Sequence, residues 1–345
     1  MKAPEHWYQT PGWRARALAP VAAVYAAGAR LRTRLTVPQR ASVPVVCVGN
    51  ITAGGSGKTP VAIAIAHRLA ARGLRPAFLT RGYGGRLAGP VQVNAETSHA
   101  IDVGDEPLLL AQHFTTIVSR DRPKGADAAA LAGADIVVMD DGYQNPTLWK
   151  DAGVLVVDGA SGLGNGHLIP AGPLREPAHD ALSRAACLII MGAGEAGKSV
   201  AARADASGVP TLHGVLQPVD DGTRWQGTRV LAFAGIGRPA KFFQTLRSLG
   251  ADIRETEVFP DHHMYTDDEA QAMLSVAQAR GLTLVTTSKD NARLKWSGHS
   301  GALAELYKAA QIIQVEVVFD DGDALDQLLM ARIQTTSAAD AYKAF

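Results

Sequence analysis

A glycine-rich segment near the start of the chain carries the residues best suited to chemistry. It follows the apolar run Val45 to Val48, precedes a helical stretch, and reads Gly54-Gly55-Ser56-Gly57-Lys58-Thr59-Pro60. Backbone N–H groups of such a loop bind phosphate oxygens, the lysine contacts the terminal phosphates, and the threonine hydroxyl is a magnesium ligand. The segment therefore predicts an ATP-binding loop, although Thr52 stands where the usual pattern has its first glycine.

A second segment matches the phosphate-loop pattern more literally. It also follows an apolar run and reads Gly192-Ala193-Gly194-Glu195-Ala196-Gly197-Lys198-Ser199. The first segment is favoured because Pro60 begins a long helical pattern whose apolar residues would pack beneath the loop. The second segment has only about seven helical residues before Gly208, so we expect Lys58 rather than Lys198 to contact the phosphates.

Two adjacent aspartates follow another apolar run. Asp140 and Asp141 come directly after Ile136 to Met139, and Gln144 lies close behind them. A carboxylate at the carboxyl end of a strand beside a phosphate loop is a common magnesium ligand. Paired aspartates in a loop are also frequent in ordinary turns. We interpret the pair, together with Thr59, as the ligands of Mg²⁺.

Two other acidic clusters allow more than one interpretation. Gly104-Asp105-Glu106-Pro107 lies where a loop meets a helix, so on the residues alone Asp105 suits a helix cap as well as a catalytic base. Asp261-His262-His263 is compatible with a phosphoesterase metal site, with a surface histidine pair, or with a group that orients a base. The upstream histidine and aspartate clusters that a two-metal phosphoesterase needs are not apparent in the sequence.

The order of apolar runs indicates the elements that position these residues. Short Val/Ile/Leu runs alternate with alanine-rich helical stretches, which predicts an α/β fold with a parallel sheet covered on both faces. A second, smaller alternating unit has Ile312 to Phe319 as its last expected strand. The expected boundaries are 1–40 for an amino-terminal segment, 41–211 for the phosphate-loop domain, 212–227 for a connector, 228–330 for the smaller domain and 331–345 for a tail.

Composition limits the class of protein. The 345 residues, 47% hydrophobic and 19% charged, exclude a disordered chain and a disulfide-stapled small fold. Cys47 and Cys187 are too few for a thiolate metal site and suit a reducing compartment. The net charge of +1 argues against a nucleic-acid partner. That value conceals a division, because residues 1–40 carry a net charge of +6 and the remaining residues −5.

The basic amino-terminal segment is a candidate membrane-contacting helix. Its longest uncharged stretch, Ala17 to Ala29, forms about 20 Å of helix against about 30 Å of hydrocarbon core, so it cannot span a bilayer. Aromatic residues and arginines on both sides suit the boundary between lipid headgroups and acyl chains. The alternatives are a helix packed on its own domain and a signal peptide, which the arginines after the apolar stretch disfavour.

Several segments, taken in order, form a characteristic series. They are Gly49-Asn50 through Lys58-Thr59-Pro60, Arg81-Gly82-Tyr83-Gly84-Gly85, Val103-Gly104-Asp105-Glu106-Pro107, Asp140-Asp141-Gly142-Tyr143-Gln144, Gly172-Pro173-Leu174-Arg175-Glu176, Phe233 to Pro239, and Phe259-Pro260-Asp261-His262-His263. This series, over about residues 10 to 295, resembles the tetraacyldisaccharide 4'-kinase family of lipid A synthesis. The resemblance implies a P-loop three-layer α/β/α domain with a second, smaller α/β/α domain. It also implies ATP and Mg²⁺ as cofactors and a peripheral position on the cytoplasmic face of the bacterial inner membrane.

The resemblance implies roles for individual residues. Asp105 would take the proton from the sugar hydroxyl, His262 would orient Asp105, and Lys58 would neutralise charge on the transferred phosphate. The candidate contacts with the acylated disaccharide phosphate are Glu106, Gln144, Arg175 and Arg81, of which arginine offers a bidentate fork to phosphate. Simpler explanations are surface charge for Arg175 and Glu176, and a flexible glycine loop after Arg81. Ser288 stands where the family often has Glu, so Ser288-Lys289-Asp290 is assigned no nucleotide role.

Two functions of different classes follow from these residues. The first is transfer of the ATP γ-phosphate to the 4'-hydroxyl of a tetraacyl disaccharide 1-phosphate, with residues 1–35 on the membrane surface and no obligate protein partner. The second is a membrane-associated P-loop ATPase that acts as a nucleotide switch. Ala53 stands where the partition ATPases carry a lysine before the paired glycines, so a nucleotide-switched dimer of their type is not supported.

Overall fold

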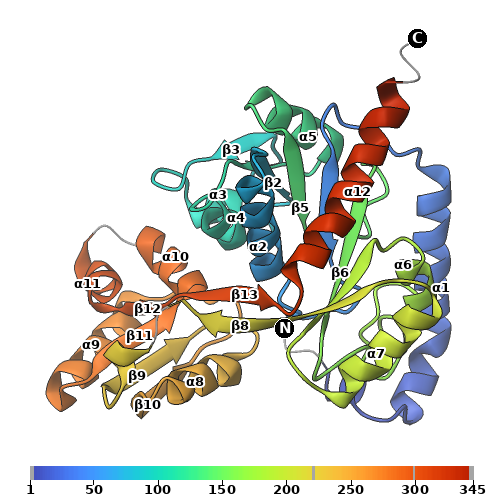
Figure 1. Ribbon diagram of the computed structural model, residues 1–345. Helices are drawn as coiled ribbons and strands as arrows, with labels where there is room; N and C mark the ends of the chain where they lie inside the picture. The colour runs from blue at the N-terminus through green and yellow to red at the C-terminus, as the bar shows by residue number, and fades with distance from the viewer. Residues whose placement is uncertain (1–3, 220–221, 298–299, 342–345) are drawn as a thin grey trace.

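The computed structural model describes residues 4–219, 222–297 and 300–341, whose strands form two sheets (Figure 1). The large sheet has the order β13-β8-β7-β6-β1-β5-β2-β4-β3, and the small sheet has the order β10-β9-β11-β12. The large sheet consists of β1 (Val45–Gly49), β2 (Pro76–Thr80), β3 (Val91–Val93), β4 (Thr116–Val118), β5 (Ile136–Asp140), β6 (Ala152–Asp158), β7 (Cys187–Met191), β8 (Thr211–Pro218) and β13 (Val315–Phe319). The small sheet consists of β9 (Arg229–Ala234), β10 (Asp252–Val258), β11 (Thr283–Thr287) and β12 (Gln311–Ile313). Residues 229–313 are termed the small-sheet region, and β1 to β8 with β13 and the helices around them are termed the large-sheet region.

Strand β1 lies in the middle of the large sheet because it is apolar on both faces. All of its residues are buried, and it pairs in parallel with β5 and β6. Val45 and Cys47 face one core, and Val46 and Val48 face the other. The first core includes α5 (Arg122–Leu131), α6 (Ala178–Leu182) and α7 (Glu195–Ala206), and the second includes α2 (Lys58–Ala71), α4 (Asp105–Leu110) and α12 (Gly322–Ala341). The predicted three-layer α/β/α arrangement is confirmed.

The small sheet repeats this arrangement on a smaller scale. Its strands are parallel, and β9 lies between β10 and β11. Leu231 and Phe233 pack against α9 (Asp267–Arg280) and α11 (Gly301–Ala309), whereas Val230 and Ala232 pack against α8 (Pro239–Ser248). Helix α10 (Ser288–Ser297) follows β11 directly. The second α/β/α unit is therefore also present.

The segment expected to be a connector is mostly a strand. Residues 211–218 form β8, which pairs in parallel with β7 and antiparallel with β13. The interpretation was wrong because Leu212 and Gly214 alternate inward against the core, a pattern that the surrounding polar residues conceal. Asp220 and Asp221 of the same expected connector lie outside the described residues.

The carboxyl-terminal boundaries also differ from expectation. The strand predicted over Ile312 to Phe319 is divided at Gln314 into β12 of the small sheet and β13 of the large sheet. The predicted tail continues α12 as far as Ala341, and residues 342–345 lie outside the described residues. Leu325, Leu329 and Ile333 of this helix pack on the second core, and the burial of these apolar side chains stabilises the helix. The chain thus returns to the large-sheet region after the small sheet.

The amino terminus forms a short 3₁₀ helix, η1 (Glu5–Tyr8), and the long helix α1 (Trp13–Leu35). Ala15 and Ala22 are its buried residues, and Arg30 forms an ion pair with Asp180 of α6 at 3.3 Å. The opposite side of α1 is exposed, and no described helix is long and apolar enough to cross a membrane. Helix α1 therefore rests on the large-sheet region by a narrow face of small residues.

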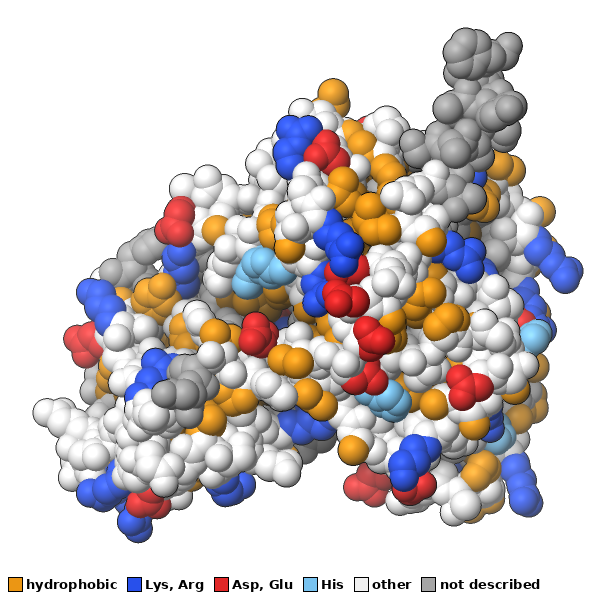
Figure 2. All heavy atoms as spheres, in the orientation of Figure 1, with side chains coloured by type: hydrophobic (Ala, Val, Ile, Leu, Met, Phe, Trp, Pro, Cys, Tyr) orange, Lys and Arg blue, Asp and Glu red, His pale blue; other side chains and the backbone are white. Residues whose placement is uncertain are grey.

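Charges of both signs intermix on the face drawn in Figure 2. Among these charged residues, Arg68 and Arg72 of α2 bind Asp326 of α12 at 2.7 Å and 2.8 Å. These contacts attach the final helix to the carboxyl-terminal end of the helix that begins at the phosphate loop.

Candidate active site

The predicted phosphate loop joins the carboxyl end of β1 to the first turn of α2. Gly54 and Gly57 have φ values of +122° and +86°, which glycine adopts without strain. Asn50, a buried residue that the sequence reasoning did not single out, donates from Nδ2 to the Thr52 carbonyl at 2.7 Å and fixes the turn. Gly55 is exposed and Ser56 is buried. The loop thus presents the amino-terminal end of α2 to the edge of the sheet, where an anion is stabilised.

The two aspartates after β5 lie beside this loop and differ from each other. Asp140 is buried and accepts a hydrogen bond at Oδ2 from the Thr59 hydroxyl at 2.9 Å. Burial, and then the charge of Glu106, raise the pKa of Asp140 to about 7, although Lys58 opposes the shift. Asp141 is partly exposed and lies 3.7 Å from Lys58 Nζ through Oδ1. The predicted cation, hydroxyl and acid pair are therefore neighbours in space.

The second literal phosphate-loop motif lacks this arrangement. Lys198 is exposed and pairs with Glu195 of its own helix at 2.7 Å. A Cβ on Gly194 would lie 2.3 Å from the Gly159 carbonyl oxygen, so this glycine serves close packing. Helix α7 runs from Glu195 to Ala206, longer than the sequence led us to expect. The glycines of this motif are thus explained without a phosphate.

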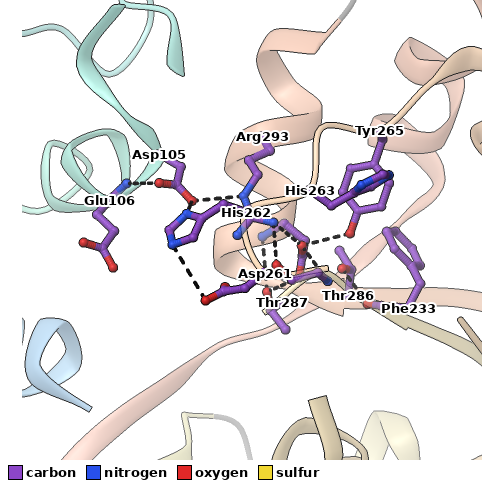
Figure 3. A network of polar contacts seen from close by, with 12 residues as sticks. Asp105, Glu106, Phe233, Asp261, His262, His263, Tyr265, Thr286, Thr287 and Arg293 are labelled. Carbon is purple, nitrogen blue, oxygen red and sulfur yellow. Dashed lines mark hydrogen bonds and ion pairs between the residues drawn. The ribbon is translucent and has the colours of Figure 1, made fainter. Parts of the chain in front are cut away.

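Asp105 lies where the two sheet regions meet (Figure 3). It begins α4 of the large-sheet region, and its Oδ2 accepts hydrogen bonds from His262 Nδ1 and Arg293 Nε of the small-sheet region, each at 3.0 Å. Its Oδ1 accepts the backbone N–H of Glu106 at 3.0 Å. The side chain is 8% exposed. The base candidate is therefore held by groups that are more than 150 residues away in the chain.

Burial and hydrogen bonding act in opposite directions on the pKa values of Asp105 and His262. Burial by itself would raise the pKa of Asp105, but the hydrogen bond from His262 and the charges of Arg293, His262 and Lys289 hold it well below its usual range. The hydrogen bond to Asp105 raises the pKa of His262 above its ordinary value, with burial acting against it. Asp105 is thus a carboxylate, and His262 is favoured as a cation beside it.

A buried network behind Asp105 was missed by the sequence reasoning. Asp290 Oδ1 accepts from Gly235 N, Tyr265 Oη and Arg293 Nη1 at 3.0, 2.8 and 2.7 Å, and its Oδ2 accepts from the Thr287 hydroxyl at 2.6 Å. Arg293 is only 1% exposed. The usable signal was the spacing of Asp290 and Arg293, one helical turn apart on α10. In a strongly polar helix, however, an acid and a base at this spacing are typical of an exposed surface pair.

The structure brings most, but not all, of the predicted substrate contacts to this edge. Arg175 Nη1 lies 3.3 Å from Asp141 Oδ1, and Glu106 pairs with Lys289 at 2.7 Å. Gln144 donates to the Asn50 carbonyl at 2.8 Å and to Glu176 at 3.0 Å, so its amide supports the loop.

In the described part of the chain, neither Arg81, a predicted substrate contact, nor His263, the neighbour of the predicted His262, is bonded to the acid pair or to Asp105. Arg81 is exposed after β2, and among the described residues no hydrogen bond or ion pair joins it to Asp140 or Asp141. His263 pairs with Glu269 at 2.9 Å and stacks on Phe259, with ring centroids 4.9 Å apart. His262, and not its neighbour, is therefore the histidine that reaches Asp105.

Comparisons with known proteins agree with this geometry. A family model described as LpxK, tetraacyldisaccharide-1-P 4'-kinase, matches residues 14–334. The chain is 51% identical over 327 residues to a tetraacyldisaccharide 4'-kinase of Parvibaculum lavamentivorans, with 93% of this chain and 95% of the relative covered. It is 45% identical to that of Rhizobium meliloti, with 98% and 96% covered. A crystal structure of LpxK from Aquifex aeolicus in complex with ATP matches with a TM-score of 0.71 at 25% identity, covering 92% of this chain and 99% of that one.

Proposed function

Because this chain belongs to the tetraacyldisaccharide 4'-kinase family, we propose that its phosphate loop and its Asp105–His262 pair act on one reaction. The protein is an ATP-dependent lipid A precursor kinase. In the proposed reaction the γ-phosphate of ATP moves to the 4'-hydroxyl of a tetraacyldisaccharide 1-phosphate. The observation that carries the joint role is electrostatic, since the charge of Glu106, next to Asp105, raises the pKa of Asp140 beside the phosphate loop. The two groups therefore lie within electrostatic reach of each other.

Lys58 and the residues Gly54, Gly55, Ser56, Gly57, Thr59 and Pro60 are proposed to form the ATP site. Backbone N–H groups of the loop would bind the phosphates, while the Lys58 ammonium would neutralise charge as it develops on the transferred group. Its present partner Asp141, at 3.7 Å, holds the ammonium over the loop.

The acid pair fits Mg²⁺. Among the described side chains, buried Asp140 Oδ1 has no hydrogen-bond partner, which leaves a desolvated oxygen facing the loop. Thr59, Asp140 and Asp141 would hold the ion, because hydroxyl and carboxylate oxygens are its preferred protein ligands. Bound there with ATP, Mg²⁺ supplies neutralisation of the phosphate charge.

Asp105 is proposed as the base for the sugar hydroxyl. Its Oδ1 accepts one hydrogen bond from Glu106 N, so a lone pair remains for the 4'-hydroxyl. As the hydroxyl oxygen bonds to the γ-phosphorus, its proton passes to Asp105, and the bond from this phosphorus to the bridging oxygen breaks to release ADP. A carboxylate with a low pKa suits a loose transition state, in which the proton leaves late. His262 and Arg293 would fix its orientation.

Substrate contacts follow from the same edge of the sheet. Arg175, beside Asp141, and exposed Arg81 are proposed to bind phosphate or sugar oxygens of the acylated disaccharide. Glu106 is proposed to approach the sugar beside Asp105. Gln144 is proposed to act by supporting the Asn50 turn, because its amide is already bonded there.

Helix α1 is proposed to contact the cytoplasmic surface of the inner membrane. At about 100° per residue, five of the six large apolar residues that α1 exposes share a stripe about 80° wide, opposite buried Ala15 and Ala22. These five are Trp13, Val21, Val24, Leu31 and Leu35, and Tyr25 lies about 40° beyond them. Arginines lie on both sides of the stripe, where they would meet lipid phosphates. No nucleic acid and no obligate protein partner enter this proposal.

Product analysis tests the proposal. The full chain is incubated with ATP, Mg²⁺ and the lipid disaccharide monophosphate in mixed micelles, and the lipid is examined by mass spectrometry. We expect a product with one additional phosphate at the 4' position and an equal amount of ADP. Slow ATP hydrolysis with nucleotide-dependent dimerisation and no phosphorylated lipid would favour the nucleotide switch instead.

A further inference from the structure

Asp158 binds two cations of the small-sheet region from the end of β6. Its Oδ2 accepts from Arg238 Nη1 and from Lys241 Nζ, each at 2.6 Å. Its Oδ1 accepts from the backbone N–H and the hydroxyl of Ser161 at 3.0 and 2.9 Å. Arg238 also donates from Nη2 to the Ser161 hydroxyl at 3.2 Å. The two sheet regions are therefore joined by an ion cluster separate from the Asp105 contacts.

This cluster is shielded enough to be strong. The Asp158 side chain is 5% exposed, Arg238 is 33% exposed and Lys241 is 54% exposed. Burial would raise the pKa of Asp158, but the hydrogen bonds from Arg238 and Lys241 hold it well below its usual range. Charge-assisted hydrogen bonds to a buried carboxylate are stronger than neutral ones, and removal of one partner leaves that charge less compensated.

The cluster lies beside the phosphate loop. Asp158 ends the strand that pairs in parallel with β1, so both reach the same edge of the sheet. Tyr8 contacts the loop, because its hydroxyl donates to the Ala53 carbonyl at 3.3 Å. Burial raises the pKa of Tyr8, and the charges of Arg238 and Asp158 act on it in opposite directions. The ion cluster and the loop are thus within electrostatic reach of one tyrosine.

The segment that carries Arg238 also holds the partners of Asp105. This segment joins β9 to α8, and its Gly235 carbonyl accepts from His262 N at 3.2 Å and from Arg293 Nη1 at 2.9 Å. A Cβ on Gly237 would lie 3.3 Å from Asp261 Oδ2, so the backbone packs directly on the histidine loop. Gly235, which contacts His262 and Arg293, lies only three residues before Arg238. A shift of Arg238 relative to Asp158 would therefore also displace His262 and Arg293.

We propose that Asp158, Arg238 and Lys241 form an interdomain clamp that positions His262 and Arg293 against Asp105. The clamp residues are positioning residues of the kinase reaction, and they act through the small-sheet segment from Gly235 to Arg238. One salt-bridged cluster fixes one side of this segment and the Asp105 contacts fix the other. The kinetic consequence rests on the proposed roles of Asp105 and His262, whereas the clamp itself concerns only the orientation of the two regions.

Two measurements on Arg238→Ala and Lys241→Ala test the clamp. Both side chains are partly exposed, so the variants should fold, and Arg247→Ala at the other end of α8 is the matched control. We expect kcat/KM to fall about tenfold or more for Arg238→Ala, less for Lys241→Ala, and not for Arg247→Ala.

The second measurement is the distance between spin labels on Leu131→Cys of the large-sheet region and Ala272→Cys of the small-sheet region. The native cysteines are buried, and the distribution of distances should be broader in Arg238→Ala than in the parent chain.

A double-mutant cycle separates positioning from general stabilisation. Because Arg238 acts through His262, Arg238→Ala should cost little further activity in a His262→Ala background. A full additional tenfold loss there, or unchanged kcat/KM together with an unchanged distance distribution in Arg238→Ala, would overturn the clamp. A broadened distribution in a chain that transfers no phosphate to lipid would support the clamp and refute the proposed function.

Discussion

The phosphate loop and the Asp105 group are built by the chain in different ways. The loop, its lysine and the acid pair come from the ends of two adjacent strands, β1 and β5, of one sheet. Asp105 comes from the large-sheet region, but His262 and Arg293, which hold it, come from the small-sheet region. The first site is therefore complete within one region, whereas the second exists only when two regions are correctly oriented.

This difference separates two tasks of a kinase. Binding of ATP needs a rigid anion site, which packing of α2 beneath the loop supplies locally. Transfer to an acceptor needs a base placed within a fraction of an ångström, and here that placement depends on hydrogen bonds between regions. We therefore expect changes at the Asp105 group to lower turnover without lowering ATP affinity, and changes at the loop to lower both.

The largest effect is expected for Asp105→Asn. The amide keeps the shape of the side chain but cannot take the proton, so kcat should fall by about 10²- to 10⁴-fold. ATP affinity, measured by calorimetry, should stay within about twofold, because the phosphate loop is untouched. Asp102→Asn, which weakens the ion pair of a mostly buried carboxylate with exposed Arg86, is the matched control and should retain activity. Loss of ATP binding in Asp105→Asn would break the distinction between the two sites.

The loop should respond differently to Lys58→Ala. Removal of the ammonium withdraws charge neutralisation from the transferred phosphate, so kcat should fall about 10²- to 10³-fold. ATP affinity should fall with it, unlike in the Asp105 variant. Lys198→Ala alters an exposed pair with Glu195 and should leave both quantities unchanged. Loss of ATP binding in Lys198→Ala with a normal Lys58→Ala variant would transfer the ATP site to the second motif.

The same difference explains what could be predicted from the sequence. The loop and acid pair are contiguous residues after apolar runs, so their chemistry and the three-layer fold follow from local pattern. The contact of His262 with Asp105 could be predicted only from the family resemblance, because no local sequence pattern specifies a contact between two sheet regions. Asp290 and Arg293 read as surface charge for the same reason. Strand β8 was missed because only Leu212 and Gly214 alternate inward among polar residues, so its apolar pattern is weak.

Helix α1 offers a smaller, separate effect on where the enzyme works. Trp13→Ala removes the most amphipathic member of the exposed stripe, so binding to vesicles with anionic lipid should weaken about tenfold. Leu131→Ser, which alters an exposed apolar residue on α5, is the matched control and should bind normally. Deletion of residues 1–35 should weaken binding further, most of all at low salt, where attraction to anionic lipid is strongest. Equal binding by Trp13→Ala and the parent chain would leave α1 as a packed helix.

The smallest effect concerns pH, and one group of each site should contribute to it. The pKa of His262 is raised in the folded chain, so its contribution is complete below about pH 6.5 and is lost as the pH rises through the folded value. The contribution of Asp105 to stability changes with pH in the opposite direction. Because its pKa is lowered, this contribution is present above about pH 4 and is lost only in stronger acid. Asp140 acts in the same direction as His262, because its pKa, raised to about 7, gives a contribution that is lost as the pH rises through that value. The free energy of unfolding should therefore decline as the pH rises from about 6 through the raised pKa values of both groups.

Urea denaturation of three variants at both ends of this range assigns that decline. His262→Gln should remove the part of the decline that the histidine contributes, because the glutamine carries no charge to lose. Asp140→Asn should remove the other part, and His263→Gln should keep the parent slope, since its side chain pairs with Glu269. A parent-like slope in His262→Gln would show that the histidine does not hold its charge against Asp105. A slope that His262→Gln abolishes completely would mean that the two sites titrate together, and the loop would then not be independent of the small-sheet region.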